Sequence, residues 1–240
     1  MKIIGLILTH NCEKMLQRTI DKIPKDQLDE VICSDDGSKD DTINILKKNN
    51  IISFEHENFG YGGNLQYGLD KAFELGADYV IELHGDGQYD FSKINKTKEI
   101  IKDKMPDLIL GNRFYNFFVP IKSKMDIIRY IGNIVVTKFS SIGLGIKSRD
   151  LFPGYRVYSK NLFKSIPMSK LSKYYFFSFE IIALSKLMNL KICSQPIDCD
   201  YSKEHSTMSI WMGVPFILHT LKTIFYYRLA KLGFKLGIFK

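Results

Sequence analysis

Three clusters of polar residues follow apolar runs in the first half of this 240-residue chain, at residues 9–13, 34–38 and 84–90. Each cluster contains carboxylates. Carboxylates that converge on one crevice repel one another, so they usually accompany a cation or a ligand rich in hydrogen-bond donors. One such cluster alone is typical of a turn or a helix cap. Three of them at the ends of apolar runs indicate a site for a charged ligand.

The elements that must position these clusters are short apolar runs alternating with amphipathic patterns. Strands are expected at residues 3–8, 30–34, 51–55, 79–83, 108–111 and 190–197, and the clearest helix of the second half at 179–188. Leu16, Ile20 and Ile23 recur at helical spacing between the first two strands. This alternation predicts an α/β fold, with a mainly parallel central sheet and helices on both faces. Because ligands bind beyond the carboxyl ends of such strands, the three clusters are expected to meet there.

The composition excludes several protein classes and points to anionic partners. Hydrophobic residues make up 45% of the chain, which excludes a disordered chain, a collagen-like repeat and a small disulfide scaffold. Lys and Arg number 34 against 26 Asp and Glu, an excess that favours nucleic acid, anionic lipid or phosphorylated substrates. The four cysteines show no CxxC spacing, so we expect free thiols in a reducing compartment.

The two ends of the chain bear on its location. The apolar run at residues 3–8 is too short for a signal peptide, and no run reaches the roughly 18 residues of a membrane span. Residues 205–240 carry five Lys or Arg, no acidic residue and many aromatic residues. This pattern predicts an amphipathic helical tail on a membrane surface. We therefore expect a cytoplasmic protein held peripherally at the cytoplasmic face of the membrane. The alternative is a helix that packs on the rest of the chain or on a second subunit, which leaves a homo-oligomer open.

Six short segments occur in an order that is itself informative. They are THNCE (9–13), DDGSKDDT (35–42), NFGYGGN (58–64), HGDGQYD (84–90), GNRF (111–114) and DLFPGYR (150–156). Together they resemble the motifs of family-2 inverting glycosyltransferases with the GT-A fold, in the branch of dolichyl- and polyprenyl-phosphate sugar synthases and their bacterial relatives. The resemblance runs from residue 3 to about residue 208. Each segment alone is a weak signal, whereas six in order are a strong one.

The resemblance implies where the nucleotide of a nucleoside-diphosphate sugar binds. Base and ribose contacts are implied for Thr9, Asn11, Glu13 and Asp35, with Asp36 close by. A carboxylate such as Asp35 can accept a hydrogen bond from a base N–H or a ribose hydroxyl. The glycine-rich segment that contains Gly62 and Asn64 is the implied donor loop.

The resemblance also implies a divalent metal, Mg²⁺ or Mn²⁺, that bridges the diphosphate. Asp86 and Gln88 match the oxygen ligands of the family's DxD motif. His84 stands where the first Asp of that motif usually lies. An imidazole accepts Mn²⁺ better than Mg²⁺, so His84 either binds the metal or contacts the donor instead.

Four further residues are implied in catalysis and acceptor binding. Arg113 matches a guanidinium that stabilises the leaving nucleotide, and Asp150 matches an acidic position suited to a general base. A hydroxyl acceptor requires such a base, whereas an ionised phosphate acceptor requires cations, for which Arg129 and Arg156 are the candidates.

The implied activity is inverting, metal-dependent transfer of a sugar to a polyprenyl-phosphate or membrane-associated glycan acceptor. We expect a GT-A domain over residues 1–204, with a nucleotide-sugar-binding half at 1–115 and an acceptor half at 116–204, followed by the tail at 205–240. The alternative is a catalytically silent nucleotide-sugar-binding protein. A nicotinamide site is not favoured, because the glycines at 60–63 follow the third strand and lack the required spacing. Nucleic-acid binding is not favoured either, since no recognition motif accompanies the positive charge.

Overall fold

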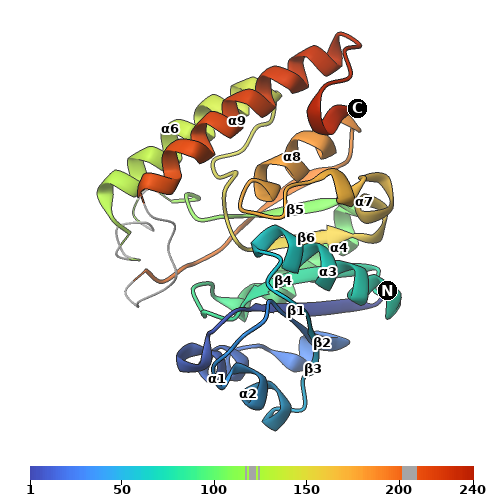
Figure 1. The fold of residues 1–240 in the computed structure, drawn as a ribbon, viewed down its shortest axis with the longest axis vertical. Helices are drawn as coiled ribbons and strands as arrows, with labels where there is room; N and C mark the ends of the chain where they lie inside the picture. The colour runs from blue at the N-terminus through green and yellow to red at the C-terminus, as the bar shows by residue number, and fades with distance from the viewer. Residues whose placement is uncertain (117, 119–122, 124, 202–209) are drawn as a thin grey trace.

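A seven-stranded sheet runs through the computed structural model, which describes residues 1–116, 118, 123, 125–201 and 210–240 (Figure 1). The strands, in the order β3-β2-β1-β4-β6-β5-β7, are Ile52–Glu55 (β3), Glu30–Asp35 (β2), Ile3–Thr9 (β1), Tyr79–His84 (β4), Arg156–Ser159 (β6), Leu108–Asn112 (β5) and Ile192–Pro196 (β7). Among these strands, β6 alone runs antiparallel to its neighbours. The predicted mainly parallel α/β sheet is confirmed.

Helices cover both faces of this sheet. They are α1 (Glu13–Asp21), α2 (Thr42–Lys48), α3 (Tyr61–Glu74), α4 (Ile94–Lys104), α6 (Ile127–Leu144), α7 (Lys160–Ser165), α8 (Phe177–Leu187) and α9 (Ile210–Lys231), with short 3-10 turns at Lys25–Gln27, Phe91–Lys93, Met168–Lys170 and Gly237–Phe239. Strand β1 is buried along its whole length, and its side chains alternate between two cores. Ile4 and Leu6 pack with residues of α3 and α8, whereas Ile3 and Ile7 pack with residues of α1 and α4. This alternation explains why the strand is a continuous apolar run.

The predicted strands all occur, but two elements of the second half were not anticipated. β6 is only four residues long and begins with the buried Arg156, so it lacks the apolar run that marks the other strands. Helix α6 occupies a segment from which the sequence showed only aromatic and basic character. All four cysteines are free thiols, as expected.

Helices α6 and α9 lie side by side at one edge of the molecule and run in the same direction (Figure 1). Near their ends, the Tyr227 hydroxyl donates to the Leu144 carbonyl at 3.2 Å. Gly143 allows close approach, because a Cβ there would lie 2.6 Å from Ile224. Helix α9 also contacts α8, where His219 Nε2 lies 2.7 Å from Glu180 Oε1. One side of the predicted tail is therefore packed on the rest of the chain.

The other side of α9 carries apolar residues where a strictly amphipathic helix would carry polar ones, including Leu218 and Phe225. The amphipathic character expected of the tail is thus not seen in this packing. The beginning of the predicted tail, at 205–209, lies outside the described residues. None of the helices in the described ranges combines the length and the hydropathy needed to cross a bilayer.

Candidate active site

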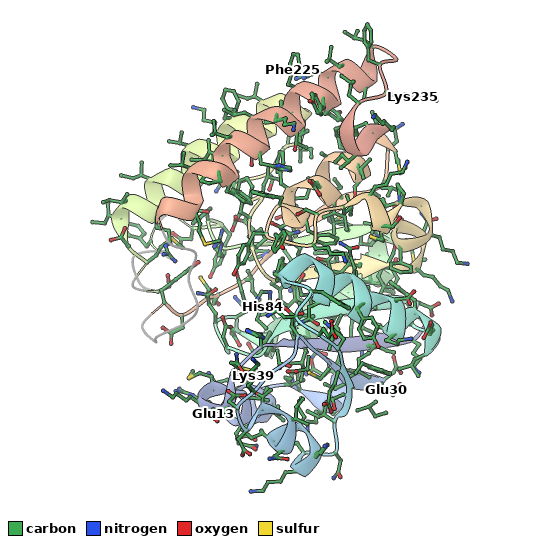
Figure 2. The ribbon with its side chains drawn as sticks, viewed as in Figure 1. Glu13, Glu30, Lys39, His84, Phe225 and Lys235 are labelled. Atoms are coloured by element: carbon green, nitrogen blue, oxygen red, sulfur yellow. The ribbon has the colours of Figure 1, made fainter. Side chains whose placement is uncertain are left out.

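A cavity of about 1160 Å³ lies beyond the carboxyl ends of β1, β2 and β4. Its wall includes residues from all three predicted polar clusters, such as Thr9, Asp36 and Asp86, so the predicted convergence is observed. Its opposite wall comes from α6 and the start of α9. Figure 2 shows His84 near the middle of the molecule, between the loops of Glu13 and Lys39 and the two helices. The volume exceeds that of most single-ligand pockets and leaves room for two substrates.

The loop after β1 and the loop after β2 hold each other through side chain to backbone hydrogen bonds. Asn11 Oδ1 accepts from the Lys39 amide at 2.8 Å, and Glu13 Oε2 accepts from the Asp41 amide at 2.9 Å. Asn11 has a positive φ of 50°, a conformation that asparagine tolerates better than most residues. Asn11 and Glu13 both line the cavity, on the side of these two loops.

Asp35 is not part of the cavity wall. Its Oδ2 accepts from the hydroxyls of Thr9 and Ser38, each at 2.6 Å, and its Oδ1 accepts from the Ser38 amide at 2.8 Å. The side chain is buried, and three donors already occupy the carboxylate. The observed bonds position Thr9 and the turn, and the base or ribose contact predicted for Asp35 stays a prediction.

Asp36 and Asn64 organise the start of the donor loop. Asp36 Oδ1 accepts from the Phe59 amide at 2.6 Å and its Oδ2 from the Gly60 amide at 3.1 Å. Asn64 Nδ2 donates to the Thr9 carbonyl at 3.3 Å. Both side chains line the cavity, whereas Gly62 does not. A Cβ at Gly62 would lie 2.5 Å from the Ser172 carbonyl oxygen, so this glycine serves packing rather than the approach of a donor.

The predicted metal residues are placed at the cavity in the loop after β4. Asp86 and Gln88 both line it, and Asp86 Oδ1 accepts from the Gln88 amide at 3.0 Å, across a turn made by Gly87 with a φ of 67°. In the described part of the chain, no three His, Cys, Asp or Glu side chains come together as a metal site.

His84 takes part in a buried network that the sequence analysis missed. Its Nε2 lies 2.9 Å from Glu82 Oε1, and the fully buried Glu82 also accepts from the hydroxyls of Tyr61 and Tyr158, each at 2.7 Å. Burial acts to lower the pKa of His84, but the hydrogen bond and charge of Glu82 raise it overall. In this arrangement Nε2 is taken by Glu82 and is not available to a metal. A glutamate inside the apolar strand at 79–83 was the available sequence signal for this network.

Arg113 and Asp150 form a buried ion pair. Arg113 Nε donates to Asp150 Oδ2 at 2.7 Å and Nη2 to Oδ1 at 2.9 Å, while Nη1 donates to the Tyr201 hydroxyl at 2.7 Å. Asp150 is fully buried and is not part of the cavity wall, although Arg113 is. Arg113 was predicted to stabilise the leaving nucleotide and Asp150 to act as a base. The structure instead pairs the two side chains with each other.

The two predicted acceptor cations both line the cavity, from different elements. Arg129 lies in the first turn of α6 and is partly exposed. Arg156, in β6, is fully buried, and its Nε and Nη1 donate to the carbonyls of Pro153 and Ser178. Its Nη2 has no hydrogen-bond partner among the described residues. A buried cation with an unused N–H group is suited to an anionic ligand.

A mainly parallel sheet with a polar cavity beyond its strand ends is typical of α/β proteins that bind a ligand there. The profile of glycosyl transferase family 2 matches residues 6–166, so the chain belongs to this family and the resemblance is confirmed. The chain is 30% identical to the UDP-N-acetylglucosamine--dolichyl-phosphate N-acetylglucosaminyltransferase of Methanococcus voltae, over 84% of this chain and 87% of that protein. It is 27% identical to the low-salt glycan biosynthesis hexosyltransferase Agl6 of Haloferax volcanii, over 70% of this chain and 39% of that protein.

Solved structures show the same fold. The chain superposes on glucosyl-3-phosphoglycerate synthase from Mycobacterium tuberculosis, in its complex with Mn²⁺, UDP and glucosyl-3-phosphoglycerate, with a TM-score of 0.68. The identity is 15%, and the superposition covers 94% of this chain and 79% of that one. A complex of the same enzyme with Mn²⁺, UDP-glucose and glycerol 3-phosphate gives a TM-score of 0.67. These similarities confirm the predicted fold.

Proposed function

We propose that the protein transfers a sugar, with inversion, from a nucleoside-diphosphate sugar to the phosphate of a polyprenyl lipid. The observation that carries this proposal is the single cavity, which joins the strand-end polar loops to α6 and α9. The similarity to a dolichyl-phosphate sugar transferase supports a lipid phosphate as the acceptor.

The surroundings of Asp150 favour a phosphate over a glycan hydroxyl. A hydroxyl acceptor requires a general base within hydrogen-bond reach. Asp150 is fully buried outside the cavity wall, and its carboxylate accepts hydrogen bonds from Arg113 and from the Phe152 amide. A phosphate is already ionised and requires cations instead, which Arg129 and Arg156 supply on the cavity wall. The Arg113–Asp150 pair then serves to position the wall.

A divalent cation fits the donor set at the loop after β4. Mg²⁺ and Mn²⁺ favour oxygen ligands, and Mg²⁺ is commonly held by one or two carboxylates together with substrate phosphates. Asp86 offers such a carboxylate and Gln88 an amide oxygen, both on the cavity wall. When bound, the cation neutralises the charge that develops on the leaving diphosphate. Asp36 and Asn64, which hold the start of the donor loop, line the same cavity.

A second candidate is a catalytically silent nucleotide-sugar-binding protein. The observation that favours it is His84, which stands at the first position of the DxD motif and donates to Glu82. Both candidates bind a nucleotide sugar, so binding alone does not separate them.

The test measures release of nucleoside diphosphate from UDP-, GDP- and dTDP-sugars, with Mg²⁺ or Mn²⁺, in the presence and absence of polyprenyl phosphate. We expect release from one donor that requires both the metal and the lipid phosphate. Tight donor binding without release under any condition would favour the silent protein.

A further inference from the structure

The outer sides of α6 and α9 carry exposed apolar residues at helical spacing. On α6 they include Ile131, Val135 and Phe139, and on α9 Leu218, Leu221 and Phe225; these six residues are named the α6–α9 face. Phe139 is 55% exposed and Phe225 59% exposed. The two helices are neighbours (Figure 1), and Phe225 lies at the outer edge of the molecule (Figure 2).

Such a face requires a partner. Single exposed apolar residues are common on proteins, but stripes on two adjacent helices form a patch of the kind that binds a partner or a membrane. The sides of α6 and α9 that face the protein are already packed, since Thr137, Ser140, Ile224 and Tyr227 are buried there. The α6–α9 face is therefore additional to the packing that the fold needs.

The charge of α6, α9 and the segment after α9 favours an anionic partner. Residues 127–144 and 210–240 contain no Asp or Glu, although the whole chain has 26 of them. The same ranges contain seven cationic residues, namely Arg129, Lys138, Lys222, Arg228, Lys231, Lys235 and Lys240. A second copy of this chain would bring like charges together across the interface, which opposes association. A bilayer with anionic headgroups accepts both the apolar side chains and the cations.

The cavity adjoins this face. Its wall includes Ile128, Arg129 and Val136 of α6 and Phe216 and Ile217 of α9. Because both helices run away from the cavity in the same direction, the α6–α9 face extends from the cavity along the outside of the molecule (Figure 1). A phosphate held near Arg129 would leave its hydrocarbon chain beside apolar side chains.

We propose that the α6–α9 face lies in the headgroup layer of a bilayer that contains anionic lipid, with the cavity opening toward that layer. Binding of the α6–α9 face to a bilayer does not depend on which reaction the protein catalyses. The orientation of the cavity rests on the proposed function, because it assumes that the acceptor is a lipid phosphate. Binding requires neither helix to cross the membrane, which agrees with the hydropathy of the described helices.

The experiment is flotation of the full-length protein with vesicles of phosphatidylcholine, with and without phosphatidylglycerol, at low and high salt. The test variants are Phe139→Glu and Phe225→Glu, and Ile52→Glu is the matched control, since Ile52 is 52% exposed on the edge strand β3. We expect the wild type and the control to float with anionic vesicles at low salt. Each test variant should bind about tenfold less, because it places a negative charge at the anionic surface.

Thermal unfolding of each variant shows whether it is folded; little change is expected, since both aromatic rings are exposed. Equal binding by the test variants and the wild type, or no binding of the wild type to anionic vesicles, would overturn the proposal. So would a wild-type dimer in sedimentation that dissociates in both test variants, because a second copy would then cover the face. Normal flotation together with no sugar transfer to polyprenyl phosphate would support membrane binding by the α6–α9 face and reject the proposed function.

Discussion

The two walls of the cavity are built differently. On the side of the sheet, Asn11, Glu13 and Asp36 each accept hydrogen bonds from backbone amides of a neighbouring loop, and Asp35 behind them accepts from Thr9 and Ser38. On the side of α6 and α9, the wall is largely apolar, and its polar side chains Asp126, Arg129 and Asn133 come from one helix and its N-cap. Hydrogen bonds between loops therefore hold the polar groups of the first wall, whereas the second wall offers mainly apolar side chains and the Arg129 cation.

This difference matches the two substrates proposed. A nucleotide has many donors and acceptors at fixed positions, so a preorganised wall binds it with little loss of conformational freedom. A lipid phosphate offers one charged group and a flexible chain, for which cations and an apolar surface are sufficient.

The largest expected effect is on stability, at the Arg113–Asp150 pair. Asp150→Asn leaves the buried Arg113 without its counter-charge, and we expect the free energy of unfolding to fall by about 3–5 kcal/mol. Urea denaturation measures this, with Asp70→Asn on the exposed side of α3 as the control. A variant as stable as the wild type but inactive in transfer would instead restore Asp150 as the general base.

The next effect is on activity, at the first wall. Asp86→Ala should lower the transfer rate by about 100-fold or more, because stabilisation of the leaving diphosphate by a cation is worth several kcal/mol. The fold should be retained, since Asp86 lies in a loop at the cavity. Asp70→Ala serves as the control, and EDTA should reproduce the loss in the wild type. Full activity of Asp86→Ala would remove this residue from the reaction.

A smaller effect is expected at Asp35. Asp35→Ala removes the acceptor for the Thr9 hydroxyl and for two groups of Ser38, so the free energy of unfolding should fall by about 1–3 kcal/mol. Calorimetry with UDP and GDP should show a smaller loss of affinity than for Asp36→Ala, which acts on a residue of the cavity wall. Unchanged stability with lost affinity would place Asp35 in direct contact with the nucleotide.

The smallest effect concerns the second wall. Arg129→Ala should raise the KM for polyprenyl phosphate by about tenfold with little change in kcat, because one charged hydrogen-bond partner of the phosphate is lost. Lys138→Ala is the matched control, since Lys138 is exposed on the same helix and does not line the cavity. The assignment of Arg129 fails if the two variants have the same KM.

Much of the first half of the molecule could be predicted from the sequence. Apolar runs such as 3–8 are buried on both faces of a parallel sheet, so their pattern alone identifies the strands. The strand-end rule then brings residues such as Thr9, Asp36 and Asp86 to one cavity. These conclusions need only local patterns and one general rule of topology.

The finer roles depended on contacts that no local pattern reveals. Arg113 and Asp150 are 37 residues apart and form their ion pair only after β5 and the segment before β6 come together. Asp35 accepts a hydrogen bond from Thr9, a residue on another strand, and does not itself line the cavity. In the same way, the apolar exposure of α9 depends on which of its sides α6 and α8 cover.

The central claim is that one cavity receives a nucleotide sugar at the sheet and a lipid phosphate at α6. The most direct measurement is mass spectrometry and NMR of the lipid product formed from the active donor, polyprenyl phosphate and a divalent metal. We expect a single sugar joined through phosphate to the lipid, with the anomeric configuration inverted relative to the donor. A product with retained configuration, or transfer to a glycan hydroxyl with the lipid phosphate unchanged, would contradict it.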